Sequence, residues 1–423
     1  MSEPTAGAGA FVDWLRDNVV HLDTLDPDGP LDDLEPLRDV VGAARVVAIG
    51  ENAHFIREFT QARQRILRFL VERCGFTAFA FEFGFSEGFA LDRWVRDGAG
   101  VDLATVSEAA AAWGAGDLLR HLRGLTTGSG RPVRFVGIDI PEAGGSLLPA
   151  LQPVAEYLRD VDADALPALD AAIATAEKFA GKSGASAAPA WAGLATAEQD
   201  ALTAALARLL LRFRGLRPLY VERGGQHDYD VALRRLEAAG HADYMLRAMN
   251  GLFTGTGLPG DMSVRDRFMA DSVRWHLEHG DPETRIVLAA HNNHIQRAPV
   301  SYGGVLTTLP MGLHLDRALG GAYLPIAVTS TADRTAEMRL DSSAPAGFAV
   351  VDAALPPPEP GSVEAAALAA EVRLGLVDLR RAPAAVEGLD RIRSQSDYMR
   401  TPLAEAFDAV VVVPTATLAV PSL

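Results

Sequence analysis

Residues 45–54 read RVVAIGENAH, an apolar run that ends in a glycine, an acid, an asparagine and a histidine. Three other runs follow the same plan: TAFAFE at 77–82, VRFVGID at 133–139 and RIVLAAHNNH at 285–294. Short apolar runs separated by helical patterns are typical of buried parallel strands. In open α/β sheets the ligand site lies outside the carboxyl ends of the strands. The four runs therefore predict an α/β fold with a largely parallel central sheet and a site at one edge.

Ionisable side chains follow the first and fourth of these runs. Glu51 and His54 follow the first run with a spacing that lets both face one substrate atom. His291 and His294 repeat that spacing after the fourth run, with two asparagines between them. The structural alternatives are a helix cap beside a solvent histidine at the first position, and turns or caps at the second. Carboxylates and imidazoles gathered at one edge favour general acid–base catalysis.

Glu82 and Asp139 end the second and third runs. A carboxylate at the end of an apolar strand is partly desolvated, so its pKa rises unless it pairs with a cation. We expect Glu82 to be catalytic, or ion-paired with Arg63 or Arg93, and the two roles are compatible. Asp139 suits a helix cap as well as a catalytic acid. Arg265 opens a later helical stretch, where it could bind a carboxylate or stabilise an oxyanion.

The carboxylates and histidines named above are side chains that could bind a zinc ion. The H-E-x-x-H spacing of zinc hydrolases is, however, absent from the sequence. We therefore predict no metal and no other cofactor.

Residues 84–88 read GFSEG and match G-x-S-x-G, the nucleophile elbow of α/β-hydrolases. The motif follows a strand and precedes a helical stretch at Ser86–Arg96, and the histidines come later, as in that fold. An elbow places its serine directly after the strand, whereas Glu82-Phe83 intervenes here. We therefore expect Ser86 to cap the helix, and we keep a serine nucleophile as an alternative mechanism.

The composition argues against several classes of protein. The chain has 423 residues, of which 48% are hydrophobic, and a net charge of −16. An acidic chain without a Lys/Arg run suits neither a nucleic acid nor an anionic membrane. The first ten residues lack the features of a signal peptide, and no uncharged apolar run reaches about 18 residues. We expect a cytoplasmic protein whose partner is a small molecule, and its oligomeric state stays open.

The hydrophobic pattern divides the chain into three parts. Residues 1–145 and 281–423 are expected to form the two halves of the α/β core. Residues 146–280 read as a helical insertion that caps the strand ends, and Gly181–Ala192 within it reads as a loop or mobile lid. Further strands are expected at 322–329, 348–351, 374–379 and 409–413.

The insertion is expected to form an apolar wall of the substrate pocket. The candidates for this wall are Trp191, Phe213, Tyr220, Tyr229, Tyr244, Met245 and Phe253.

Six stretches together resemble the erythromycin esterase family. They are GENAH at Gly50–His54, Arg57 and Arg63 in the helix after it, TAFAFE ending at Glu82, RDRFMAD at Arg265–Asp271, AAHNNH at Ala289–His294, and FDAVVVVPTAT at Phe407–Thr417. They occur in the family's order over nearly the whole chain. The resemblance implies an α/β core with a helical insertion, and hydrolysis of the erythromycin macrolactone without a tightly bound metal.

The resemblance also implies residue roles. His54 matches the position proposed as the general base. The other matching active-site positions are Glu51, Arg63, Glu82, His291 and His294. Residues expected to bind the substrate are Arg57, Arg265, Asn292 and Asn293. This sequence has Asn52-Ala53 and Phe55 where many members have a small residue, a threonine and a glycine, and these departures concern the pocket lining and hence the substrate.

The sequence thus predicts a metal-independent hydrolase of an ester or lactone in a hydrophobic natural product, macrolide-like or polyketide-like. We expect His54, polarised by Glu82 or Glu51, to take a proton from water. We expect Arg63, with His291 or His294, to stabilise the oxyanion. The same groups suit a biosynthetic elimination, acyl transfer or cyclisation, and a non-catalytic binding protein is a further alternative. A role in antibiotic resistance and one in biosynthesis both stay open.

Overall fold

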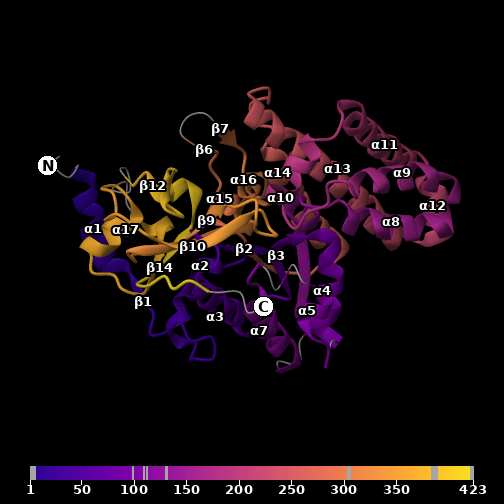
Figure 1. Ribbon diagram of the computed structural model, residues 1–423. Coiled ribbons are helices and arrows are strands. Elements are labelled where there is room, and N and C mark those ends of the chain that lie inside the picture. Colours follow the sequence, from indigo (N-terminus) through magenta and orange to yellow (C-terminus); the bar gives the residue numbers. More distant parts are fainter. Residues whose placement is uncertain are drawn as a thin grey trace.

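A largely parallel sheet runs through the centre of the molecule (Figure 1). The computed structural model describes residues 6–97, 100–107, 110, 113–128, 132–302, 306–382 and 389–419. Within these residues the central sheet has eight strands in the order β1-β11-β14-β8-β2-β5-β3-β4. All pairs from β14 to β4 are parallel. The predicted α/β class is confirmed.

The four strands that carry the ionisable endings are neighbours in this sheet. They are β2 (Val46–Ile49), β5 (Ile286–Ala289), β3 (Ala78–Gly84) and β4 (Arg134–Asp139). Parallel pairing brings their carboxyl ends to the same edge. Strand β5 inserts between β2 and β3, although it follows β4 in the chain, so the His291 segment enters the middle of the site.

The remaining strands of the sheet lie on the other side of β2. Strands β8 (Tyr323–Ser330) and β14 (Ala409–Val413) continue the parallel order, whereas β11 (Gly375–Asp378) and β1 (Val20–His21) run antiparallel at the edge. Two smaller sheets accompany it. One pairs β9 (Arg334–Leu340) with β10 (Phe348–Ala354), and the other contains β12 (Arg391–Ser394), β13 (Asp397–Arg400), β6 (Val300–Tyr302) and β7 (Leu306–Thr308).

The strand predicted at 348–351 is therefore real but lies outside the central sheet. It forms part of β10, which pairs antiparallel with β9. Most of its side chains are partly exposed, unlike those of the buried parallel strands.

Helices cover both faces of the central sheet. Val47 and Ile49 pack in one hydrophobic cluster with α3 (Arg57–Cys74) and α7 (Gly116–Gly128). Val46 and Ala48 point to the opposite face, against α14 (Ser263–His279) and α16 (Met311–Leu319). Because both faces are buried, the strands read as continuous apolar runs. The other helices around the core are α1 (Ala6–Asn18), α2 (Pro36–Val41), α4 (Phe85–Asp97), α5 (Leu103–Val106), α15 (Asn292–Ile295), α17 (Val363–Ala369) and α18 (Leu403–Ala406).

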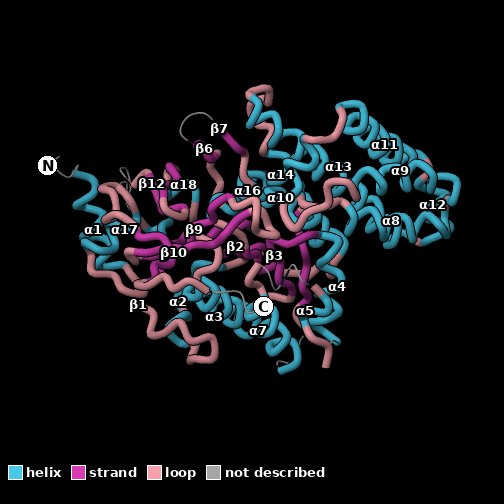
Figure 2. The backbone as a smooth tube through the Cα atoms, viewed as in Figure 1, coloured by secondary structure: helices cyan, strands magenta, loops and turns pink. Residues whose placement is uncertain are grey.

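The helices between β4 and β5 form a lobe beside the sheet, and Figure 2 shows it as almost entirely helical. They are α8 (Leu148–Val161), α9 (Leu166–Ala176), α10 (Gly184–Ala192), α11 (Thr196–Gly215), α12 (Arg217–Gly224), α13 (Gln226–Thr254) and α14. The lobe has its own hydrophobic core, which includes Leu151, Phe213 and Leu246. No helix in the described ranges is long and apolar enough to cross a membrane.

The loop predicted at Gly181–Ala192 is wrong for most of its length, because the segment contains helix α10. The Ser183 side chain accepts a hydrogen bond from the backbone N–H of Ser186, and Ser186 reciprocates in a capping box. This cap, with the alanines that follow it, favours a helix despite the glycines.

Candidate active site

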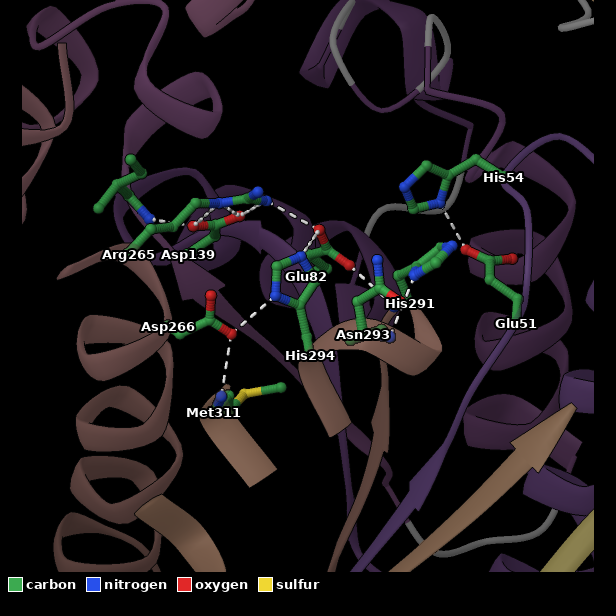
Figure 3. A network of polar contacts seen from close by, with 12 residues as sticks. Glu51, His54, Glu82, Asp139, Arg265, Asp266, His291, Asn293, His294 and Met311 are labelled. Atoms are coloured by element: carbon green, nitrogen blue, oxygen red, sulfur yellow. Dashed lines mark hydrogen bonds and ion pairs between the residues drawn. The ribbon is translucent and has the colours of Figure 1, made fainter. Parts of the chain in front are cut away.

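A buried carboxylate joins His54 to Arg63 beyond the end of β2. Nδ1 of His54 lies 2.6 Å from Oε1 of Glu51 (Figure 3). Nη1 of Arg63 lies 2.8 Å from Oε2 of the same carboxylate. Arg63, on helix α3, also donates to the carbonyl oxygen of Ala290 at 2.7 Å. Glu51, rather than Glu82, is thus the hydrogen-bond partner of His54.

This contact sets the charge preferences of both groups. Burial opposes ionisation of Glu51, but the positive charges of Arg63 and His54 outweigh it and hold its pKa below the usual value. Burial likewise opposes protonation of His54, but the Glu51 carboxylate outweighs it and raises the pKa of that imidazole. Nε2 of His54 has no hydrogen-bond partner among the described residues, and the side chain lines a pocket. His54 therefore presents one uncommitted ring nitrogen to a ligand.

A second ion-pair group occupies the ends of β3 and β4. Arg265, in the first turn of α14, donates to both oxygens of Asp139 at 2.6–3.1 Å and to Oε1 of Glu82 at 2.8 Å (Figure 3). Oε2 of Glu82 accepts the backbone N–H of His291 at 3.0 Å. The prediction that Glu82 pairs with Arg63 or Arg93 is wrong. Arg63 pairs with Glu51, and the partner of Glu82 is Arg265, which belongs to the helical lobe.

A bulge in β3 positions Glu82. The strand continues to Gly84, and its register against β4 shifts between Phe81 and Gly84. One extra residue in a strand re-aims the neighbouring side chains. The strands approach closely here, because a Cβ added to Gly137 of β4 would lie 2.1 Å from the carbonyl oxygen of Gly84.

His294 lies between two carboxylates. Its Nδ1 is 2.7 Å from Asp266 of α14, and its Nε2 is 3.4 Å from Glu82 (Figure 3). Burial opposes protonation, but Asp266 and Glu82 outweigh it and raise the pKa of His294 to about 9. His294 is therefore an imidazolium at neutral pH. Asp266 was not among the residues expected at the site, although it directly follows Arg265 in the sequence; it also accepts the backbone N–H of Met311.

His291 is committed on both ring nitrogens. The backbone N–H of Asn293 donates to its Nδ1 at 3.1 Å, so Nε2 carries the proton and donates to the carbonyl oxygen of Asn52 at 3.0 Å. Burial, with the nearby charge of His54, lowers its pKa to about 3. His291 is not among the residues that line the pocket. It is placed to organise the strand ends rather than to donate to a ligand.

Three of the expected substrate-binding residues lie outside the pocket lining. Asn292 is fully buried and bonds both backbone groups of Val328, and a Cβ on Gly50 would lie only 1.8 Å from its Oδ1. Asn293 donates to the hydroxyl of Ser394. Arg57 is exposed at the start of α3. Of the four, only Arg265 lines the pocket.

The pocket is a cavity of about 450 Å³ between the strand ends and the lobe. Its polar wall contains Glu51, His54, Arg63, Glu82, Arg265, Asp266 and His294. Its apolar wall contains Phe55, Phe81, Phe83, Trp113, Leu118, Met245, Met249, Met262, Met338 and Phe348. A mostly apolar cavity of this size with a few convergent polar groups is typical of a site for a small organic molecule.

The lobe contributes methionines and the start of α10 to this cavity rather than its aromatic residues. Of the expected wall residues only Met245 lines it. Trp191, Phe213, Tyr220 and Tyr229 are buried in the lobe's own core, while Tyr244 and Phe253 are exposed. The sequence pattern could not distinguish a helix face that fills the lobe from one that faces a ligand.

Ser86 does not face the pocket. It is buried, its hydroxyl has no hydrogen-bond partner within the described residues, and α4 already begins at Phe85, so the predicted cap is also wrong. Its neighbour Glu87 does line the pocket and accepts the backbone N–H of Glu142 at 2.7 Å. Burial raises the pKa of Glu87 to about 7. A serine without a base or access to the ligand is a poor nucleophile.

No group of three or more His, Cys, Asp or Glu side chains within the described ranges is arranged to hold a metal ion. The carboxylates of the site are instead engaged by Arg63, Arg265 and the histidines.

Known proteins that resemble this chain match it over almost its whole length. A family model described as erythromycin esterase matches residues 71–416. Erythromycin esterase type II of Escherichia coli is 36% identical over 414 residues, covering 95% of this chain and 96% of that protein. Erythromycin esterase type I of Escherichia coli is 35% identical over 389 residues, covering 91% and 94%.

Solved structures give the same picture. A mutant of the erythromycin esterase EreC, solved in its open conformation, superposes with a TM-score of 0.87 at 32% identity and covers 93% of this chain and 96% of its own. A succinoglycan biosynthesis protein shares the fold with a TM-score of 0.74 at 18% identity, covering 97% and 98%.

Proposed function

Because the chain belongs to the erythromycin esterase family, we propose that it hydrolyses the lactone ester of a macrolide or a similar macrocyclic natural product. The observation that carries this proposal is the Glu51–His54 hydrogen bond, which leaves Nε2 of His54 uncommitted at the wall of a largely apolar cavity. A histidine held in this way by a carboxylate is a general base with a defined tautomer.

In the proposed reaction, neutral His54 takes a proton from a water molecule through Nε2. The resulting hydroxide adds to the lactone carbonyl carbon and forms a tetrahedral oxyanion. When this intermediate collapses, the ring C–O bond breaks and the proton on His54 passes to the leaving alkoxide oxygen. The products are an alcohol and a carboxylic acid, which then loses its proton to the solvent and becomes a carboxylate. Glu51 stabilises the imidazolium that exists between the two proton transfers.

The oxyanion needs a positive or hydrogen-bonding group nearby. We assign this role to Arg63 and to the imidazolium of His294, which both line the cavity. His291 is the weaker candidate, since it does not line the cavity and burial lowers its pKa, so that it lacks the positive charge of His294. Glu82, Asp139 and Asp266 are then positioning residues that hold Arg265 and His294 in place.

We further propose that the reaction needs no metal and that residues 146–280 act as the substrate-selecting part between two halves of a core at 1–145 and 281–423. Met245 and Met249 of α13, Met262 just before α14 and the first residues of α10 support this proposal, because they line the same cavity as His54. Methionine side chains adapt to irregular apolar ligands.

The test is incubation of the purified protein with erythromycin A, followed by mass spectrometry. Hydrolysis adds the mass of one water, and heavy-oxygen water should label the new carboxylate. His54→Asn should lose at least about 10²-fold in turnover. His241→Asn, a matched change in the helical lobe away from the cavity, should retain turnover.

Other outcomes would select the alternatives. A product lighter by one water would favour elimination, and tight binding without turnover would favour a metabolite-binding protein. Wild-type turnover by His54→Asn would remove that residue from the mechanism.

A further inference from the structure

Phe55 has a backbone conformation that its side chain disfavours. Its φ is 61°, in the left-handed region that bulky residues rarely adopt. The residue follows His54 directly and is 7% exposed. Non-glycine residues held in this region concentrate at ligand sites, where the surrounding structure maintains the strain.

The C-terminal segment clamps the backbone around Phe55. The carbonyl oxygen of Phe55 accepts a hydrogen bond from the backbone N–H of Ala419 at 2.7 Å. The backbone N–H of Arg57 donates to the carbonyl oxygen of Thr417 at 2.9 Å. Between them, Ile56 and Leu418 form an antiparallel bridge. The left-handed conformation is therefore imposed by pairing with residues far along the chain.

This conformation brings two consecutive side chains to one cavity. In an extended chain the side chains of His54 and Phe55 would point to opposite sides. Here both line the pocket, with ring centroids 6.3 Å apart at 79°.

Two further aromatic rings continue the surface next to Phe55. Trp113 stacks on Phe55 with centroids 6.1 Å apart at 17°, and Phe348 follows at 5.2 Å from Trp113. We call Phe55, Trp113 and Phe348 the aromatic wall.

We propose that Phe55 is a specificity-determining residue that selects bulky apolar esters. The apolar face of a macrocycle rests on the aromatic wall, and this contact brings the ester carbonyl to Nε2 of His54. The C-terminal segment pairs with the backbone at this positive φ, and at this φ the ring of Phe55 lies beside the base. Apolar contact scales with the area covered, so a small ester gains little from the wall. This inference rests on the proposed hydrolysis.

The experiment compares Phe55→Gly and Phe55→Asn with the wild type, because both new residues accept a positive φ and keep the loop folded. Phe135→Leu is the control, since Phe135 is a buried ring of the same core that does not line the cavity. Steady-state kinetics are measured with erythromycin A and with p-nitrophenyl acetate, and calorimetry measures the affinity for erythromycin A.

We expect KM for erythromycin A to rise about 10-fold or more in both Phe55 variants, which corresponds to roughly 1.4 kcal/mol of lost contact. Values of kcat/KM for p-nitrophenyl acetate should stay within about 2-fold, because the small ester covers little of the wall. The control variant should change neither. Equal losses with both esters would show that Phe55 only positions His54, and unchanged values with both would show that the wall is not used; either overturns the inference.

Failure of the proposed function gives a different pattern. If the wild type hydrolyses neither ester, the hydrolase proposal is wrong, and the calorimetric affinities then decide the role of Phe55. Weaker binding of erythromycin A by both Phe55 variants would support the wall, and equal binding would overturn it.

Discussion

Replacing Glu51 by glutamine tests whether the carboxylate sets the basicity of His54. The wild-type carboxylate accepts a hydrogen bond from His54 at 2.6 Å and forms an ion pair with Arg63 at 2.8 Å. Glutamine has the same size, but it is neutral and has only one acceptor oxygen. In the Glu51→Gln variant, either His54 or Arg63 therefore faces an amide N–H instead of an acceptor.

The Glu51→Gln variant should lose both stability and activity. Glu51 and Arg63 are only 6% and 4% exposed. Removing one partner of a buried ion pair costs about 3–5 kcal/mol, and we expect about 3 kcal/mol because Arg63 keeps its bond to Ala290. A base without its orienting carboxylate should also lose much of its catalytic contribution, so we expect kcat/KM at its plateau to fall about 10²-fold.

The pH profile separates these effects from a general loss of structure. Water activation requires neutral His54, so wild-type kcat/KM falls as the pH decreases through the pKa of that imidazole. Glu51 raises this pKa, and burial alone would lower it. The acidic limb of the profile should therefore move to lower pH in Glu51→Gln. The assay is kcat/KM for erythromycin A between about pH 5 and pH 9, with urea unfolding of the same samples.

Glu58→Gln is the matched control. Glu58 is also a buried glutamate, in the first turn of α3. Its carboxylate accepts hydrogen bonds from the hydroxyls of Thr415 and Thr417 rather than from a histidine. Its loss should lower stability without moving the acidic limb. If the limb of Glu51→Gln stays in place or moves to higher pH, the titrating group is not a His54 controlled by Glu51, and the reasoning fails.

Four further outcomes are expected. Ser86→Ala should keep turnover within about 2-fold and stability within about 0.5 kcal/mol, since its hydroxyl is buried without a partner in the described part of the chain; an acyl-enzyme trapped on Ser86 would contradict this. The raised pKa of His294, about 9, contributes stability below its unfolded value, which is lost as the pH rises from 6.5 through 9. Urea unfolding should therefore show a decline of about 1–3 kcal/mol over that range that is absent in His294→Asn. The pKa of Glu87, about 7, lies above its unfolded value of 4.5, so Glu87→Gln should be more stable than the wild type by about 1–3 kcal/mol above that pKa and equal to it below 4.5; a gain at both ends of the range would refute this cause. Prolonged treatment with a chelator should leave turnover unchanged, and activity lost with a bound metal and regained on its return would disprove metal independence.

The sequence alone was sufficient for the fold class and for most of the polar site. The apolar runs that end at Ile49, Ile138 and Ala289–Ala290 are buried on both faces. A strand buried on both faces has apolar residues at nearly every position, so the local sequence is enough to predict it. The polar endings of the four runs marked His54, Glu82 and His294 as members of one edge, because parallel strands place their carboxyl ends together.

The tertiary structure decided which groups are partners. Strand β5 lies between β2 and β3, and this order brings His294 and the backbone of His291 to Glu82, whereas Arg265 reaches the same carboxylate from the helical lobe. The positive φ of Phe55 depends on pairing with Leu418 and Ala419, and the lobe's aromatic residues pack inward while its methionines face the cavity. Local sequence specifies what a strand or helix can bury, whereas partners and pocket faces depend on contacts between distant segments, which form only when the whole chain packs.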